Sequence, residues 1–89
     1  MPLFLAEHVW KKDQTLEVMA AAQPLLTGER LPSNVKLHAS YLYVEKQKAF
    51  CIWEVDTIGL LEDVFEAEKL PCKNTFSPIT QIYPARATQ

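Results

Sequence analysis

Glycine is scarce in this chain: Gly28 and Gly59 are the only two among 89 residues. The turns that hold the phosphates of a dinucleotide need several glycines close together, so a glycine-rich dinucleotide site is excluded. The sequence also has no Cys-x-x-Cys pair, no closely spaced histidines and no Gly-x-Ser-x-Gly elbow. The common zinc-binding and hydrolase motifs are therefore missing.

Positive charge is not concentrated anywhere along the sequence. Nine Lys and Arg stand against eleven Asp and Glu, which gives a formal net charge of -2. Nucleic acids and anionic membranes attract basic patches, so we expect neither as a partner. No apolar run approaches the roughly 20 residues that span a bilayer, and no export signal is recognisable. We expect a cytoplasmic protein whose Cys51 and Cys72 are reduced thiols.

The sequence does contain a regular order of hydrophobic patterns. Those patterns predict strands over 3–10, 35–44, 49–55 and 75–83 and helices over 15–28 and 57–69. The order β-α-β-β-α-β is typical of the ferredoxin-like, or split βαβ, arrangement. We therefore predict an α+β fold with a four-stranded antiparallel sheet and two helices on one face. One domain is expected over 1–84, followed by a loose tail at 85–89.

Local signals refine these elements. Leu16 and Met19 begin an i, i+3, i+4, i+7 stripe that is predicted to face the sheet. Pro24 is expected to kink the first helix, and Gly28 to end it. Pro78 cannot donate a ladder hydrogen bond, so the last strand is predicted to lie at a sheet edge.

Both faces of the predicted central hairpin are apolar. Strand alternation places four apolar side chains on each face: Leu42, Val44, Cys51 and Trp53 on one, and Tyr41, Tyr43, Phe50 and Ile52 on the other. Two helices can cover only one face of such a sheet. We expect the second face to pack against a second copy of the chain, which would give a homodimeric α/β barrel.

One candidate pocket follows from an expected parallel, adjacent placement of strands one and three. Their ends would then bring His8 and Glu54 together, with His38 on the opposite face. The candidate ligand-binding residues are His8, Tyr41, Tyr43, Phe50, Ile52 and Glu54. A histidine beside a carboxylate can orient a small ligand, hold a divalent metal, or act as a general base with its orienting partner. The alternative is a structural histidine held by one hydrogen bond.

Three stretches, Phe4 to His8, Val35 to Tyr41 and Phe50 to Glu54, carry a family resemblance. The last contains Cys-x-x-Glu after an aromatic residue. The chain resembles a family of small, mostly uncharacterised bacterial ferredoxin-like proteins in the dimeric α/β-barrel superfamily, one branch of which binds nickel. The resemblance implies His8, Glu54 and Cys51 as positions of interest. Related sequences often have His in the second helix at the position of Phe65.

Together these observations predict a small dimeric protein that binds a small ligand or a divalent metal, nickel among them, near His8 and Glu54. No cofactor is certain, and binding is favoured over catalysis. The alternative is a cofactor-independent monooxygenase or isomerase of a small aromatic or ketone substrate, with His8 and Glu54 as its catalytic residues. A third alternative is a purely structural subunit.

Overall fold

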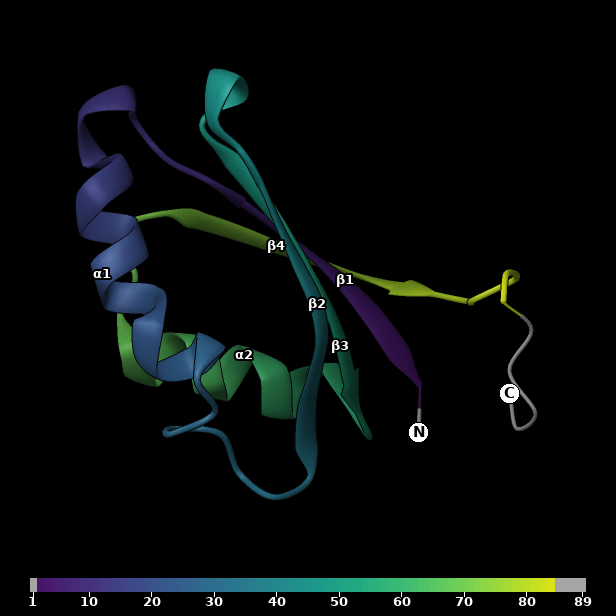
Figure 1. Cartoon of the computed structure of the whole chain (residues 1–89). Helices are drawn as coiled ribbons and strands as arrows, with labels where there is room; N and C mark the ends of the chain where they lie inside the picture. The colour runs from purple at the N-terminus through teal and green to yellow at the C-terminus, as the bar shows by residue number, and fades with distance from the viewer. Residues whose placement is uncertain (1, 85–89) are drawn as a thin grey trace.

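The chain folds as a ferredoxin-like α+β domain, and the computed structural model describes residues 2–84 (Figure 1). Its main elements are β1 (Leu3–Val9), α1 (Thr15–Leu26), β2 (Val35–Tyr43), β3 (Lys48–Val55), α2 (Ile58–Glu68) and β4 (Lys73–Ile79). Short 3-10 turns at Lys12–Gln14 and Val44–Lys46 precede α1 and β3. The predicted fold class is confirmed. The predicted tail at 85–89 lies outside the described residues.

The four strands form one antiparallel sheet in the order β2-β3-β1-β4. The expected parallel pairing of strands one and three is wrong, because β1 and β3 run antiparallel. In this topology β3 is inserted between the two strands that do run parallel, β1 and β2. The register consequently pairs His8 with Ala49 and Leu3 with Glu54.

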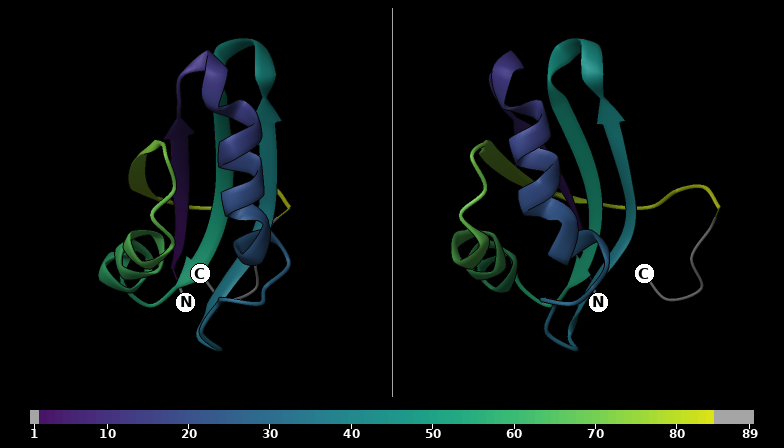
Figure 2. Two further views of the ribbon diagram at one scale, coloured as in Figure 1. Left: turned by 90° about the vertical axis from the view of Figure 1, so that its left-hand side faces the viewer. Right: turned by 60° about the vertical axis from the view of Figure 1, so that its left-hand side comes forward.

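Both helices lie on the same face of the sheet, as predicted (Figure 2). Helix α1 buries Val18 and Leu25, whereas Leu16 is 86% exposed. The predicted stripe that begins at Leu16 is therefore not the buried face of α1. The helix is apolar on more than one side, and packing against the sheet decides which side is buried. Pro24 lies in the final turn of α1, and Gly28, with φ +82°, follows its end. This is the stop that the sequence predicts.

A β-bulge interrupts β2 between Leu37 and Ala39. The bulge inserts His38 as an extra residue and moves its side chain to the face that carries Glu54. Strand alternation predicts that His38 lies on the face opposite Glu54. This prediction is wrong, because the two side chains are in contact on the same face. Regular alternation fails here because a bulge shifts the period by one residue.

Strand β4 is an edge strand, so the prediction from Pro78 is confirmed. The core lies between the helices and the sheet, where Ala6, Trp53, Val55 and Leu61 are almost completely buried. Neither helix within residues 2–84 combines the length and apolar character needed to cross a membrane.

Candidate functional site

His8 lies on the helix-covered face of the sheet, near the end of β1, and is only 5% exposed. Its ring stacks on Phe65 of α2, with the centroids 5.0 Å apart and an interplanar angle of 21°. Its Nδ1 lies 2.6 Å from Oδ1 of Asn74 on β4. Because a carbonyl oxygen only accepts, Nδ1 carries the proton and donates it.

Asn74 Oδ1 has a second donor, the thiol of Cys72, whose Sγ is 3.2 Å away. Burial raises the pKa of Cys72 to about 11, with a smaller contribution from Cys51, so the thiol keeps its proton at neutral pH. Two donors thus converge on one amide oxygen. This arrangement leaves Nε2 of His8 as an unprotonated acceptor, buried and without a hydrogen-bond partner in the described part of the chain.

Burial also lowers the pKa of His8, while the hydrogen bond to Asn74 and the charge of Glu7 partly oppose that shift. Desolvation has the largest effect because a charged imidazolium loses its hydration inside the protein. His8 is therefore neutral at pH 7, and its Nε2 lone pair is available to a bound group.

Trp53 supplies the complementary group. Its side chain is 1% exposed on β3 and meets Phe65 edge-on, with centroids 5.6 Å apart. Its indole Nε1 is buried and finds no partner within residues 2–84. The indole of Trp10, by contrast, donates to Thr15 Oγ1 at 2.9 Å. An unmade hydrogen bond costs about 1–3 kcal/mol for each buried group, so an occupant that pairs with both nitrogens would gain stability.

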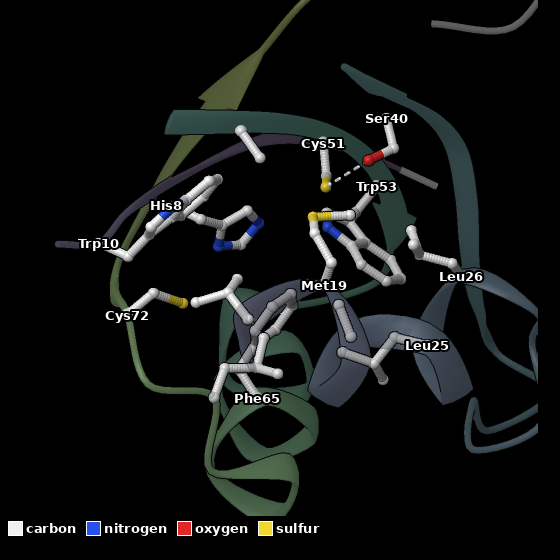
Figure 3. A pocket seen from close by; sticks show the side chains of 14 residues that line it. His8, Trp10, Met19, Leu25, Leu26, Ser40, Cys51, Trp53, Phe65 and Cys72 are labelled. Atoms are coloured by element: carbon white, nitrogen blue, oxygen red, sulfur yellow. Dashed lines mark hydrogen bonds between the residues drawn. The ribbon is translucent and has the colours of Figure 1, made fainter. Parts of the chain in front are cut away.

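The side chains that carry these two nitrogens line a cavity of about 40 Å³ between α1 and the sheet, which we call the helix-side pocket (Figure 3). Small side chains at Ala22, Ser40 and Ala49 leave the space unfilled. The pocket reaches the surface beside Leu26 and Ser40, which are both exposed. The remaining lining residues are His8, Trp10, Val18, Met19, Leu25, Cys51, Trp53, Phe65, Leu70 and Cys72.

The two thiols are part of the pocket wall and not reactive centres. Burial raises the pKa of Cys51, opposed by its hydrogen-bond contact with Ser40 Oγ at 3.2 Å. Both cysteines are free and protonated at neutral pH. Within residues 2–84, no three His, Cys, Asp or Glu side chains converge as a metal site. Among the described residues, the buried polar atoms of the pocket wall that lack a partner are therefore one acceptor, His8 Nε2, and one donor, Trp53 Nε1.

The structure does not bring His8 and Glu54 together, so the predicted pair is wrong. His8 pairs with Ala49 near the start of β3, whereas Glu54 lies near the end of β3. The two side chains are also on opposite faces of the sheet. The histidine that meets Glu54 is His38, with 2.6 Å between Nε2 and Oε1. The sequence missed this contact because nothing in it signals the bulge.

The other predicted ligand residues share the helix-free face with Glu54. We call this surface the open face; its members from the predicted set are Tyr41, Tyr43, Phe50, Ile52 and Glu54. A shallow hollow there is lined by His38, Tyr41 and Ile52 among others. His8 alone of the predicted set lines the helix-side pocket. Trp53 and Asn74 were missed, because only the sheet register places them beside His8.

Comparison with known proteins supports the fold. No family model matches the chain, and no curated protein matches it at a significant level. The structure is similar to the crystal structure of SCO4226 from Streptomyces coelicolor A3(2), with a TM-score of 0.58 and 16% identity. The similarity covers 96% of this chain and 99% of the other. At that identity the likeness shows a shared fold and nothing about a ligand.

Proposed function

We propose that this protein binds a small, largely apolar molecule in the helix-side pocket. One observation carries the proposal: His8 Nε2 and Trp53 Nε1 are buried and unpartnered within the described residues, and the side chains that carry them line the same apolar cavity. Each nitrogen would gain a hydrogen bond from an occupant. The apolar wall would supply the remaining contact area, as is usual for small-molecule sites.

Binding is favoured over catalysis by the state of His8. A general base works best when its pKa is near the working pH, and burial lowers the pKa of His8 below its usual 6.5. The predicted partner carboxylate of Glu54 is on the other face of the sheet. In the monooxygenase or isomerase alternative, His8 would therefore act as a weak base without a carboxylate to orient it.

Phenol is a suitable first probe, because its hydroxyl both donates and accepts. Its ring is larger than the cavity of about 40 Å³, so binding requires the flexible side chain of Met19 to move aside. Trp10 and Trp53 are the only tryptophans, so their two indole N–H signals can be followed by NMR during a titration. We expect a saturable shift of the Trp53 signal with a dissociation constant of about 1 mM or tighter.

The matched variants are Ala22→Leu and Ala20→Leu. Ala22 lines the pocket, whereas Ala20 is exposed on the same helix. Filling the cavity with Ala22→Leu should abolish the phenol shift, and Ala20→Leu should leave it unchanged. Equal binding by both variants, or no Trp53 shift with phenol or with toluene in the wild type, would overturn the proposal.

A divalent metal such as nickel is the second candidate occupant, since a neutral imidazole nitrogen is a good ligand for it. The position that the resemblance associates with a second-helix histidine is Phe65, whose ring stacks on His8 and offers no lone pair. We expect nickel at equimolar concentration to leave the His8 ring signals unchanged. A stoichiometric nickel-dependent shift of those signals would favour the metal.

We also propose that the open face packs against a second copy of the chain. Its apolar centre includes Tyr41, which is 64% exposed, and Ile52. Each end carries one acid and one base: Glu7 with Lys48 at 3.6 Å at one end, and the His38 pair with Glu54 at the other. A two-fold related copy would therefore meet complementary charge in either alignment.

Light scattering tests this association between about 1 and 100 µM protein. We expect a dimer mass that Ile52→Lys reduces to that of a monomer. Leu16→Lys is the control, because Leu16 is also apolar but lies on α1, away from the open face, where it is 86% exposed. A wild type that stays monomeric throughout would refute the dimer without affecting the pocket.

A further inference from the structure

The orientation of Asn74 defines what kind of polar group the pocket accepts. Its Oδ1 lies 2.6 Å from His8 Nδ1 and 3.2 Å from Cys72 Sγ. In this orientation the oxygen accepts from both the His8 ring and the Cys72 thiol. Asn74 therefore fixes the tautomer of His8 from outside the pocket.

The fixed tautomer gives the pocket two different polar atoms. His8 presents a lone pair at Nε2, and Trp53 presents an N–H that can only donate. A carboxylate would place its negative charge against the lone pair of His8, and a cation would face the indole hydrogen. A group that both donates and accepts satisfies both atoms at once.

We infer that the helix-side pocket selects a small neutral molecule that presents a hydroxyl group, with Asn74 as the positioning residue that sets this preference. The inference rests on the proposed binding function and narrows its ligand class. The hydroxyl donates to His8 Nε2 and accepts from Trp53 Nε1. It thereby makes the two hydrogen bonds that a bridging water would make, while the rest of the molecule contacts Met19 and Phe65.

Three probes of one ring size separate these contributions. Phenol donates and accepts, anisole only accepts, and toluene does neither. Their dissociation constants are measured by the shift of the Trp53 indole signal or, in variants without it, by the methyl signal of Met19. We expect phenol to bind about tenfold more tightly than toluene, with anisole between them, because each neutral hydrogen bond contributes a factor of roughly 2–10.

Two variants assign the preference to its atoms. His8→Phe should remove the advantage of phenol over anisole, and Trp53→Phe should remove the advantage of anisole over toluene. Both variants keep an aromatic ring in place, and circular dichroism verifies that they fold. Each should still bind toluene.

Asn74→Leu provides a readout that a purely structural role would not change. Without the acceptor at Oδ1, His8 can place its proton on Nε2 and turn the pocket into two donors. The ratio of phenol to anisole affinity should then fall or invert, while toluene binding stays within about twofold.

The hydroxyl preference and the binding function can fail separately. Equal affinity for phenol, anisole and toluene would overturn the hydroxyl preference and leave the binding function standing. An unchanged phenol-to-anisole ratio in folded Asn74→Leu would overturn the role of Asn74. If none of the three probes binds, the proposed function itself falls.

Discussion

Both faces of the central sheet carry apolar side chains, but the helices cover only one of them. On the helix-covered face, Trp53 and Val55 are nearly inaccessible, and the nitrogens of His8 and Trp53 are cut off from water. On the open face, Tyr41 is 64% exposed and Glu54 is paired with His38. The helices thus enclose a pocket against one apolar face and leave the other face uncovered.

The difference shows that burial, more than residue type, sets the chemistry of each histidine. Burial removes the hydration of His8, which lowers its pKa and leaves the lone pair of Nε2 without a partner in the described residues. His38 is exposed and contacts a carboxylate. One histidine suits recognition of a neutral group, and the other suits charge pairing at a surface.

The largest expected contrast is in stability. Trp53→Ala should lower the free energy of unfolding by about 3–5 kcal/mol, because it leaves a cavity in the core. Tyr41→Ala should cost below about 1 kcal/mol in the monomer, because its side chain is exposed. Urea unfolding in an Ile52→Lys background, which is expected to be monomeric, measures both, and Val55→Ala serves if Trp53→Ala does not fold. Equal costs would contradict the assignment of the two faces.

Thiol chemistry gives the next contrast. With the pKa of Cys72 raised to about 11, its thiolate fraction at pH 8 is small, so alkylation by iodoacetamide should be at least about tenfold slower than for an ordinary thiol. The comparison is Ser77→Cys on the exposed side of β4, in a background without the two native cysteines. Similar rates for Cys72 in a Cys51→Ala protein and for this new thiol would show that Cys72 is not desolvated.

His8 should make stability depend on pH. Its pKa is lower in the folded protein than its usual 6.5, so the unfolded chain binds the proton more readily. Its contribution is therefore complete above about pH 6.5 and declines on acidification until the lower folded pKa is reached. The slope is at most about 1.4 kcal/mol per pH unit.

The check is the free energy of unfolding between pH 8 and pH 5 for the wild type and His8→Phe. The variant should lose the part of the slope that His8 supplies. His38→Gln is the control on the open face and should retain that part. Identical slopes in wild type and His8→Phe would show that His8 is not desolvated.

The smallest effect is expected at the pair of His38 and Glu54. When His38 is protonated, a salt bridge of this partly exposed kind contributes about 0.2–1 kcal/mol, and salt weakens it. His38→Gln should therefore change the unfolding free energy by that amount at low salt and by less in 1 M salt. A larger, salt-independent loss would mean that the pair is buried, for example against a second copy.

Much of the fold was accessible from local signals. The order of the elements, the edge position of Pro78 and the stop at Gly28 follow from periodicity and from backbone chemistry. The phase of α1 did not, since Leu16 looked suitable for the core but is exposed. Several α1 faces are apolar enough to be buried, and only contact with the sheet selects one.

The candidate site was only partly accessible. His8 is a candidate from the sequence and lines the helix-side pocket, but its neighbours were assigned from a parallel pairing that does not occur. Asn74 and Trp53 reach His8 through strand register and helix packing, which join residues up to 66 positions apart. Contacts between residues so far apart along the chain cannot be predicted from a local sequence pattern.

By itself, the sequence determined the six-element architecture and the apolar character of both sheet faces, because alternation, helical spacing and chain breakers act over a few residues. The tertiary structure alone decided which face the helices cover, which histidine meets Glu54, and that His8 and Trp53 share one cavity. The physical reason is the distance along the chain over which each effect acts. Propensity is local, whereas burial and register depend on segments that become neighbours only when the sheet forms.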